Sequence, residues 1–286
     1  MKISEIIKSK PKIIETEKKP IALVTGASSG IGYSFTCLLA SKGYDVIAIA
    51  RDHQRLYELE NKLLTKFNAK IYVLPLDLSI NNSVDKIAEF LKKENLMVDV
   101  LINNAGFGVH GAFHETELQK ELNMVNLQIQ STLSLTKLVL PYMQERRSGF
   151  ILNVGSVYSF SPVPFQSVYG GCKSFLLSFG TSLAHENKKY KINVTTLCPG
   201  ITQTEFRIRS NIGKNINSIK HKKTSGMSAD LVAEQGYKAL MRGDLICIPG
   251  LTNRIFVQIA THLPTSLFSS ALTLVNSFRG VNSKNS

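Results

Sequence analysis

Two residues with the chemistry and spacing of an acid–base pair, Tyr169 and Lys173, lie four positions apart in the sequence. On a helix, residues i and i+4 share a face, so the phenol and the ammonium would point into the same space. A nearby cation favours the phenolate and lowers the pKa of a tyrosine from its reference value of about 10. Such a tyrosine can give a proton to a carbonyl oxygen or take one from an alcohol. The spacing also occurs on ordinary amphipathic helices, so the prediction depends on the surrounding sequence.

A glycine-rich loop lies between a predicted strand and a predicted helix near the start of the chain. Residues 21–25 form a short apolar run, residues 26–32 read GASSGIG, and an apolar pattern of helical period follows. Glycines allow close approach of the backbone to a ligand, and a helix N-terminus offers N–H groups and partial positive charge to phosphates. This arrangement predicts a dinucleotide pyrophosphate site. The predicted contacts are Gly26, Ser28, Ser29, Gly30, Ile31 and Gly32.

The residues after the second predicted strand, 45–50, indicate which dinucleotide binds. An acidic residue near this point binds the ribose 2′-hydroxyl of NAD, whereas an arginine suits the 2′-phosphate of NADP. Arg51 follows the strand directly, so we predict NADP. Asp52 is the next residue, and it either acts on the ribose or caps the helix that follows.

Small and polar residues follow the other predicted strands. Asp77 and Leu78 come after strand 70–76, and Asp77 would meet the adenine amino group or begin the next helix. Amide and small residues at a strand end let the backbone approach a cofactor and tie neighbouring strands together, or they form an ordinary turn. The residues after strands 98–102, 150–154 and 192–197 are Asn103, Asn104, Ala105 and Gly106, then Ser156, then Pro199 and Gly200.

The alternation of strands and helices predicts the fold class. Five or more such units give an α/β fold of the Rossmann type, a doubly wound parallel sheet of about seven strands with helices on both faces. Ligands bind at the carboxyl ends of the strands in such sheets. Since the residues above all stand at those ends, one functional crevice is predicted there. Asn126, midway in a predicted helix 118–146, is unfavourable inside a helix unless it is at the surface or has a function.

Taken together, these motifs resemble the short-chain dehydrogenase/reductase family. The resemblance covers about residues 20–250, and its motifs occur in the family's order and spacing. They are TGASSGIG at 25–32, NNAG at 103–106, Ser156, Tyr169-x-x-x-Lys173, and Pro199-Gly200 with Thr204.

The resemblance implies a catalytic tetrad of Asn126, Ser156, Tyr169 and Lys173, with Asn123 as the alternative to Asn126. It implies that Ser156 orients the substrate carbonyl and that Tyr169 protonates its oxygen as hydride arrives from the nicotinamide. Lys173 would lower the pKa of Tyr169 and hold the nicotinamide ribose, and Asn126 would position a water. The resemblance also implies that Pro199, Gly200 and Thr204 hold the carboxamide end of the cofactor. The other cofactor contacts that we predict are Arg51, Asp77, Leu78, Asn104, Ala105 and Gly106.

Composition limits the classes of partner. The chain has 286 residues, 43% of them hydrophobic, and a net charge of +13. A basic protein binds nucleic acid, an anionic membrane or anionic small molecules, but no nucleic-acid module is present, so we predict no nucleic-acid partner. Four scattered cysteines predict free thiols in a reducing, cytoplasmic compartment. The six histidines have no metal-ligand spacing, so we predict no metal site.

The substrate region has two informative features. Residues 206–229 contain no acid and six basic residues. They form either a solvated loop or a lid, at about 201–227, that meets an anionic carrier such as the phosphates of a coenzyme A thioester. Apolar residues flank the predicted pocket and favour an apolar substrate body: Phe107, Val109, Phe113, Phe160, Val163 and Phe165.

Both ends of the chain lie outside the predicted domain at 20–250. Residues 1–19 read as a basic arm, and residues 251–286 as a C-terminal helical extension. Residues 255–278 carry no Asp, Glu, Lys or Arg, yet they are too polar for a transmembrane prediction. The extension is a helical pair packed on the body, a dimer contact or a membrane-surface anchor. Acyl-chain and steroid ketone reductases of the family resemble the chain in such an extension, which favours lipid-like ketones.

These observations predict an NADPH-dependent reductase of a ketone or 3-oxoacyl group, working as a homodimer or homotetramer. The alternative is a catalytically silent NADP-binding regulator of the same fold, against which the intact tetrad argues. A third hypothesis is a nucleic-acid-binding protein that has this fold incidentally.

Overall fold

The computed structural model describes residues 19–206, 210 and 226–280, with side chains up to 274. The predicted basic arm, apart from Lys19, and all six basic residues of the predicted lid therefore lie outside the described residues.

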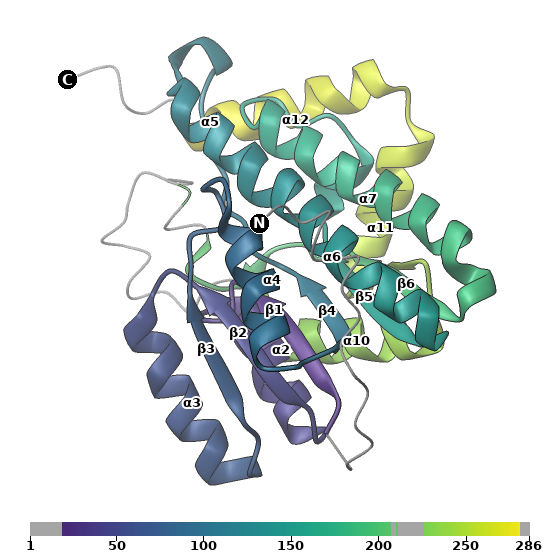
Figure 1. Ribbon diagram of the computed structural model, residues 1–286. Coiled ribbons are helices and arrows are strands. Elements are labelled where there is room, and N and C mark those ends of the chain that lie inside the picture. The colour runs from purple at the N-terminus through teal and green to yellow at the C-terminus, as the bar shows by residue number, and fades with distance from the viewer. Residues whose placement is uncertain (1–18, 207–209, 211–225, 281–286) are drawn as a thin grey trace.

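A seven-stranded parallel sheet forms the centre of the molecule (Figure 1). Its strand order is β3-β2-β1-β4-β5-β6-β9, so the chain moves outward from β1 to β3 and then returns to the other side of β1. This reversal between β1 and β4 is the position where ligands bind in doubly wound sheets. The strands are β1 (Ile21–Thr25), β2 (Asp45–Ala50), β3 (Ile71–Pro75), β4 (Val98–Asn103), β5 (Gly149–Val154), β6 (Ile192–Leu197) and β9 (Ile246–Cys247).

Helices cover both faces of the sheet, and each face has its own apolar core. On one face, α2 (Gly30–Ser41), α3 (His53–Phe67) and α10 (Ala229–Arg242) contribute Phe35, Leu59 and Val232. On the other, α4 (Ser83–Lys93), α6 (Ser131–Arg146) and α7 (Ser167–Asn187) contribute Ile87, Leu135 and Leu183. The strands are buried on both sides and read as continuous apolar runs, as expected for a parallel sheet. The predicted fold class is confirmed.

Two predicted elements differ from the structure. The last strand is only the two residues of β9, shorter than the predicted 245–249. The predicted helix 118–146 is interrupted: α5 (Leu118–Val125) leads into a π-helical segment (Asn126–Gln130) before α6. There the carbonyl of Asn126 accepts a hydrogen bond from the N–H of Ser131, five residues later. The side chain of Ser131 also donates to the Leu127 carbonyl, so it competes for a backbone acceptor of the helix.

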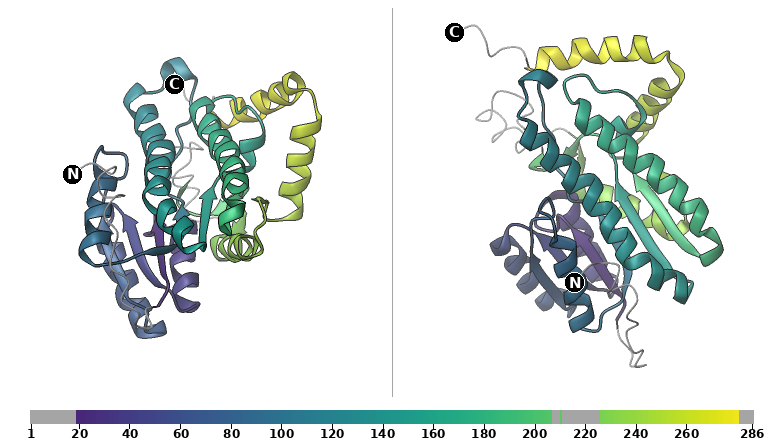
Figure 2. Two further views of the ribbon diagram at one scale, coloured as in Figure 1. Left: turned by 45° about the vertical axis from the view of Figure 1, so that its right-hand side comes forward. Right: turned by 45° about the horizontal axis from the view of Figure 1, so that its top comes forward.

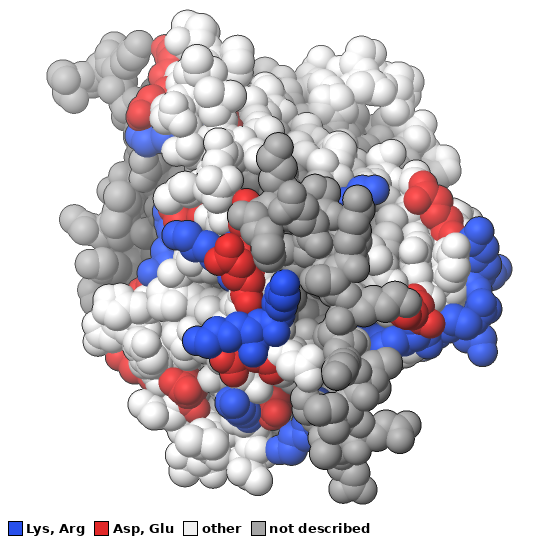
Figure 3. Space-filling view, viewed as in Figure 1, with Lys and Arg blue, Asp and Glu red and all other residues white. Residues whose placement is uncertain are grey.

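The C-terminal extension is a pair of helices, α11 (Leu251–His262) and α12 (Thr265–Gly280). Figure 2 shows the pair, in yellow, on the side of the molecule away from α3. Ala260, Phe268 and Leu272 are buried in a small cluster with Phe256, so the two helices pack against each other, and the Phe256 ring also meets that of Tyr158 on the body. A dimer contact and a membrane-surface anchor stay predictions. The top of the molecule over α12 carries few charged side chains (Figure 3). No helix among the described residues has the length and hydropathy needed to span a membrane.

Short elements complete the site. The 3₁₀ turns η1 (Phe113–Glu115) and η3 (Val157–Phe160) follow β4 and β5, and β7 (Thr202–Gln203) pairs with β8 (Met227–Ser228).

Candidate active site

A cleft of about 1310 Å³ lies at the carboxyl ends of the strands. Most of the residues predicted from the sequence line it, which places both ends of a dinucleotide site in one crevice. Among the predicted catalytic and cofactor-binding residues, two do not line it: Gly32, which lies beneath the glycine loop, and Asn126. The predicted residues that line the cleft are Gly26, Ser28, Ser29, Gly30, Ile31, Arg51, Asp77, Leu78, Asn104, Ala105, Gly106, Ser156, Tyr169, Lys173, Pro199, Gly200 and Thr204.

The glycine loop forms a cradle that side chains would fill. Gly26 has φ +67°, a conformation that favours glycine. A Cβ on Gly32 would lie 2.2 Å from the Gly26 carbonyl oxygen, so helix α2 can approach the loop only because this residue has no side chain. Ser29 is the N-cap of α2 but makes no side-chain capping bond, which leaves the first-turn N–H groups without a side-chain cap. These are the features that a phosphate requires.

Asn104 and Thr25 tie the loop to the neighbouring strand end. The Asn104 side-chain amide donates to the Thr25 carbonyl at 2.8 Å. The Thr25 hydroxyl accepts from the N–H groups of Asn104 and Ala105, both at 2.9 Å, and donates to the Ile102 carbonyl at 3.2 Å. The amide residues after β4 therefore connect β1 and β4, as the sequence predicted.

Arg51 and Asp77 face each other at the adenosine end. Arg51 is 70% exposed, and its guanidinium lies 3.7 Å from the Asp77 carboxylate. Burial alone would raise the pKa of Asp77, but hydrogen bonds from Ser79 and the charge of Arg51 lower it overall. Asp52 accepts from the Arg55 N–H at 3.1 Å and caps α3, so the capping interpretation of Asp52 is confirmed. The acidic residues that closely follow β2 and β3 are Asp52 and Asp77.

Ser156, Tyr169 and Lys173 come together on the opposite wall. Ser156 caps the η3 turn and accepts from the Tyr158 N–H at 3.1 Å, which fixes its position at the end of β5. Tyr169 and Lys173 lie in the first two turns of α7 and are only 7% and 5% exposed. The Lys173 ammonium donates to the Val154 carbonyl at 2.9 Å and lies 5.5 Å from the centre of the Tyr169 ring.

Burial, rather than Lys173, dominates the protonation of this pair. Desolvation raises the pKa of Tyr169 well above its usual value, and the Ser156 side chain offsets only part of the rise. Desolvation also lowers the pKa of Lys173 to about 8. The expected lowering of the Tyr169 pKa by Lys173 is therefore wrong for this structure. The dry surroundings disfavour the charged form of both groups, so the phenol stays neutral.

The structure favours Asn123 over Asn126 at the cleft surface. Asn123 and Leu127 line the cleft, whereas Asn126 does not. Asn123 also accepts from the Gln119 side-chain amide at 2.9 Å. The π-helical segment adds one residue to the turn that begins at Asn126 and changes which side chains face the cleft after α5. The place of Asn126 in the tetrad stays a prediction.

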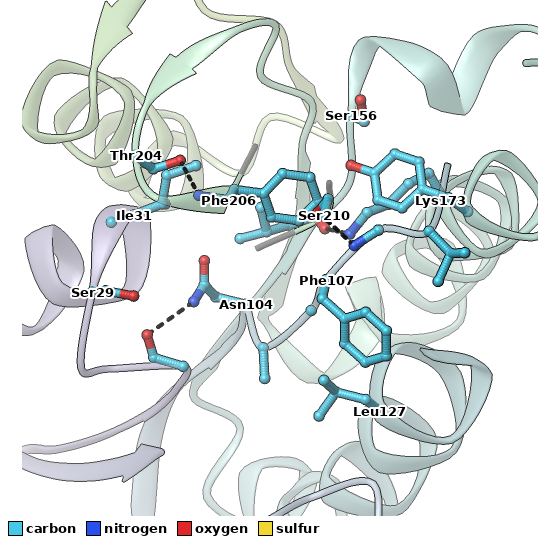
Figure 4. Close-up of a pocket in the computed structure, with 18 of the residues that line it drawn as sticks. Ser29, Ile31, Asn104, Phe107, Leu127, Ser156, Lys173, Thr204, Phe206 and Ser210 are labelled. Carbon is cyan, nitrogen blue, oxygen red and sulfur yellow. Dashed lines mark hydrogen bonds between the residues drawn. The ribbon is translucent and has the colours of Figure 1, made fainter. Parts of the chain in front are cut away.

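Phe206 and Ser210 are cleft residues that sequence reasoning missed. Phe206 lies between the glycine-loop residues Ser29 and Ile31 and the catalytic wall (Figure 4). Its ring centre is 5.8 Å from that of Tyr169. Buried Ser210 accepts from the Gly108 N–H at 3.0 Å. The noticeable feature of this segment in the sequence is its basic charge. No motif near Phe206 indicates that its ring would contact Tyr169.

The substrate side of the cleft is more polar than predicted. Of the six apolar residues expected there, Phe107 and Val109 line the cleft, whereas Phe113 is exposed and Val163 is buried. At the start of α5, the lining residues Lys120 and Glu117 form an ion pair of 2.8 Å. The polar lining residues that the sequence did not single out are His110, Glu115, Thr116, Glu117, Lys120 and Gln166.

The two glycines between Tyr169 and Lys173 differ in their surroundings. Gly171 is exposed, and a Cβ there would meet nothing within 4 Å. A Cβ on buried Gly170 would lie 3.1 Å from Val163. We expect Gly171→Ala to stabilise the protein by up to about 1 kcal/mol, because alanine is the better helix former. The same change at Gly170 should gain less, and chemical denaturation of both variants measures the difference. A larger gain at Gly170 would contradict this account.

Comparison with known proteins adds to this geometry. A family model described as short chain dehydrogenase matches residues 20–215. The very-long-chain 3-oxoacyl-CoA reductase of Pyrenophora tritici-repentis is 36% identical over 179 residues, which cover 60% of this chain and 52% of that protein. The chain thus matches about half the length of this relative.

Solved structures show the same architecture. A short-chain dehydrogenase from Sphingobium yanoikuyae, in complex with NADPH, superimposes with a TM-score of 0.74 at 27% identity, covering 93% of this chain and 99% of that one. A short chain dehydrogenase/reductase from Burkholderia phymatum, in complex with NAD, has a TM-score of 0.76 at 19% identity, covering 86% and 94%. The second likeness concerns the fold alone.

Proposed function

The chain belongs to the short-chain dehydrogenase/reductase family of oxidoreductases, and from this premise we propose that it reduces a ketone or 3-oxoacyl group to a secondary alcohol with NADPH. One observation carries the proposal. Ser156, Tyr169 and Lys173 face the same cleft as the glycine loop, so a reactive carbonyl and a dinucleotide have room to meet there.

The side chains divide the chemistry among them. Ser156 binds and orients the carbonyl oxygen. Tyr169, held neutral by burial, donates the proton that this oxygen needs to become a hydroxyl. Lys173, with a pKa of about 8, exchanges protons near neutral pH and supplies a positive charge beside the ring. When NADPH is bound, the hydride for the carbonyl carbon comes from it.

The cofactor site fits a dinucleotide along its whole length. The glycine cradle and the uncapped start of α2 suit the pyrophosphate, and Asp77 and Leu78 line the adenine end. Pro199, Gly200 and Thr204 also line the cleft, with Thr204 beside Gly30, and would hold the carboxamide. Exposed Arg51 favours the 2′-phosphate of NADP.

The substrate proposal rests on the relatives and on the cleft. The similar Pyrenophora protein is named for very-long-chain 3-oxoacyl-CoA substrates. The cleft has an apolar part at Phe107 and Val109 and a polar opening at Lys120. We infer a substrate with an apolar body and a polar or charged carrier. Assembly as a homodimer or homotetramer and peripheral membrane contact stay predictions, for which the exposed apolar residues Leu251, Ile255 and Ile259 provide surface.

The experiment that tests this function is a fluorescence titration of the purified protein with NADPH and NADH. A panel of ketones and 3-oxoacyl thioesters is then added to the complex. We expect tight NADPH binding and oxidation of NADPH by one substrate class. Tight binding without turnover across the panel would remove the reductase proposal, and no binding of either nucleotide would remove the cofactor site as well.

Cofactor choice is tested by Arg51→Asp. We expect NADPH affinity to fall by about tenfold or more, because a charge-assisted phosphate bond is replaced by repulsion. NADH affinity should change little. Arg147→Asp is the control and should leave both affinities unchanged. It makes the same charge change just before β5, at the amino ends of the strands and outside the cleft lining. Equal losses for NADPH and NADH would remove Arg51 from the 2′-phosphate.

A further inference from the structure

Tyr158 lines the cleft but has no role in the reaction proposed above. It lies in η3, two residues after Ser156, and its side chain lines the cleft. The backbone of this turn is held firmly: Ser156 accepts from the Tyr158 N–H, and the Ser156 N–H donates to the Ser159 hydroxyl, both at 3.1 Å. The position of the Tyr158 backbone is thus determined by the catalytic turn, whereas the position of its ring depends on what packs against it.

The ring of Tyr158 packs against the C-terminal extension. The Phe256 ring of α11 meets it edge-on, with ring centres 6.4 Å apart and an interplanar angle of 61°. Phe256 in turn meets Phe268 of α12 edge-on at 5.5 Å and 66°. Phe268 is buried with Ala260 and Leu272. Edge-to-face pairs contribute about 0.5–1.5 kcal/mol each beyond their buried area, so this column of three rings resists rotation of Tyr158.

The start of α11 also lies against a second residue that lines the cleft, Gly200. The Asn253 side chain donates to the Pro249 carbonyl at 2.6 Å, and the Arg254 guanidinium donates to the Ile248 carbonyl at 3.1 Å. A Cβ on Gly200 would lie 2.1 Å from the Asn253 side-chain oxygen. One helix therefore contacts both cleft residues, Gly200 through Asn253 and the ring of Tyr158 through Phe256.

We propose that Tyr158 determines which substrates fit beside Ser156, and that the C-terminal helical pair sets its position through Phe256. The proposal rests on the proposed function for the identity of the reaction. Phe256 touches neither substrate nor cofactor, so it is a positioning residue that acts through Tyr158. The helical pair thus forms the outer support of the substrate wall.

A double-mutant cycle tests this coupling. The variants are Tyr158→Ala, Phe256→Leu and the double variant; leucine keeps the apolar volume against Phe268 and removes the ring. The measured quantity is the ratio of kcat/KM for 3-oxodecanoyl over acetoacetyl N-acetylcysteamine thioester. We expect Tyr158→Ala to shift the ratio at least tenfold toward the longer chain and Phe256→Leu at least threefold in the same direction. The double variant should match Tyr158→Ala alone, because Phe256 then has nothing to position.

Two controls separate positioning from general damage. Ile255→Ala removes an exposed neighbour on the same helix and should leave the ratio unchanged. Phe256→Tyr keeps the ring and should therefore retain the wild-type ratio. The dissociation constant for NADPH should stay within about twofold in the Phe256 variants. Multiplicative effects in the double variant, or an unchanged ratio in both single variants, would overturn the proposal.

A measurement without turnover keeps the test independent of the reaction. With 3-fluorotyrosine placed at position 158, the ¹⁹F resonance should shift or change width in Phe256→Leu but not in Ile255→Ala. If the wild-type protein reduces neither thioester, the proposed function fails, and this spectrum still decides the coupling. A resonance indifferent to Phe256→Leu would overturn it.

Discussion

Tyr169→Phe is expected to lower kcat by about 10²–10⁴-fold, the usual contribution of a positioned general acid. The variant removes only the hydroxyl, and the ring still packs against Phe206 at 5.8 Å between ring centres. Since burial keeps the phenol protonated, the native residue is a ready proton donor and phenylalanine cannot replace it. Single-turnover oxidation of NADPH, followed by its absorbance, measures the loss.

The same variant should bind NADPH almost as tightly as the native protein, within about threefold. Most of the proposed cofactor contacts belong to the glycine loop and the strand ends, and the substitution leaves these unchanged. Tyr57→Phe, the same chemical change at an exposed position on α3, is the control and should leave kcat unchanged. Activity retained by Tyr169→Phe would remove Tyr169 as the acid.

Gly32→Ala is expected to abolish tight cofactor binding and to destabilise the fold. The new Cβ would lie 2.2 Å from the Gly26 carbonyl oxygen and 2.4 Å from the Asn104 side-chain nitrogen. Neither atom can move cheaply, because Gly26 is backbone and Asn104 bonds the Thr25 carbonyl. Overpacking of this kind typically costs about 1–3 kcal/mol or more. Each 1.4 kcal/mol by which the substitution destabilises the NADPH-bound state relative to the free protein weakens NADPH binding about tenfold.

Chemical denaturation and NADPH titration of this variant measure the two effects separately. Gly171→Ala is the matched control, because the same methyl group there points into open space. A Gly32→Ala protein with native stability and native affinity would show that the loop does not need the close approach of α2.

Local sequence determined much of this protein. The apolar runs, the glycine loop and the strand–helix alternation depend on the backbone preferences of neighbouring residues, and they predicted the parallel sheet and the ends where the cleft lies. Helical spacing placed Tyr169 and Lys173 on one face, and family motifs predicted Ser156 and cofactor contacts, most of which line the cleft. The sequence could place these residues because the helical spacing and the strand-end motifs each involve residues within a few positions of one another.

Tertiary structure decided what depends on distant neighbours. The pKa of Tyr169 rises because the groups packed around it exclude water. The four-residue spacing between Tyr169 and Lys173 carries no information about this burial. Asn123 rather than Asn126 lines the cleft, and the residues between β4 and α5, together with Lys120 of α5, make the substrate side polar. Phe256 meets Tyr158 across almost a hundred residues of chain. Burial and ring contacts arise only when the chain has packed. The sequence therefore indicated which residue types would meet in the cleft, whereas packing decided the protonation of Tyr169 and Lys173 and the shape of the cleft.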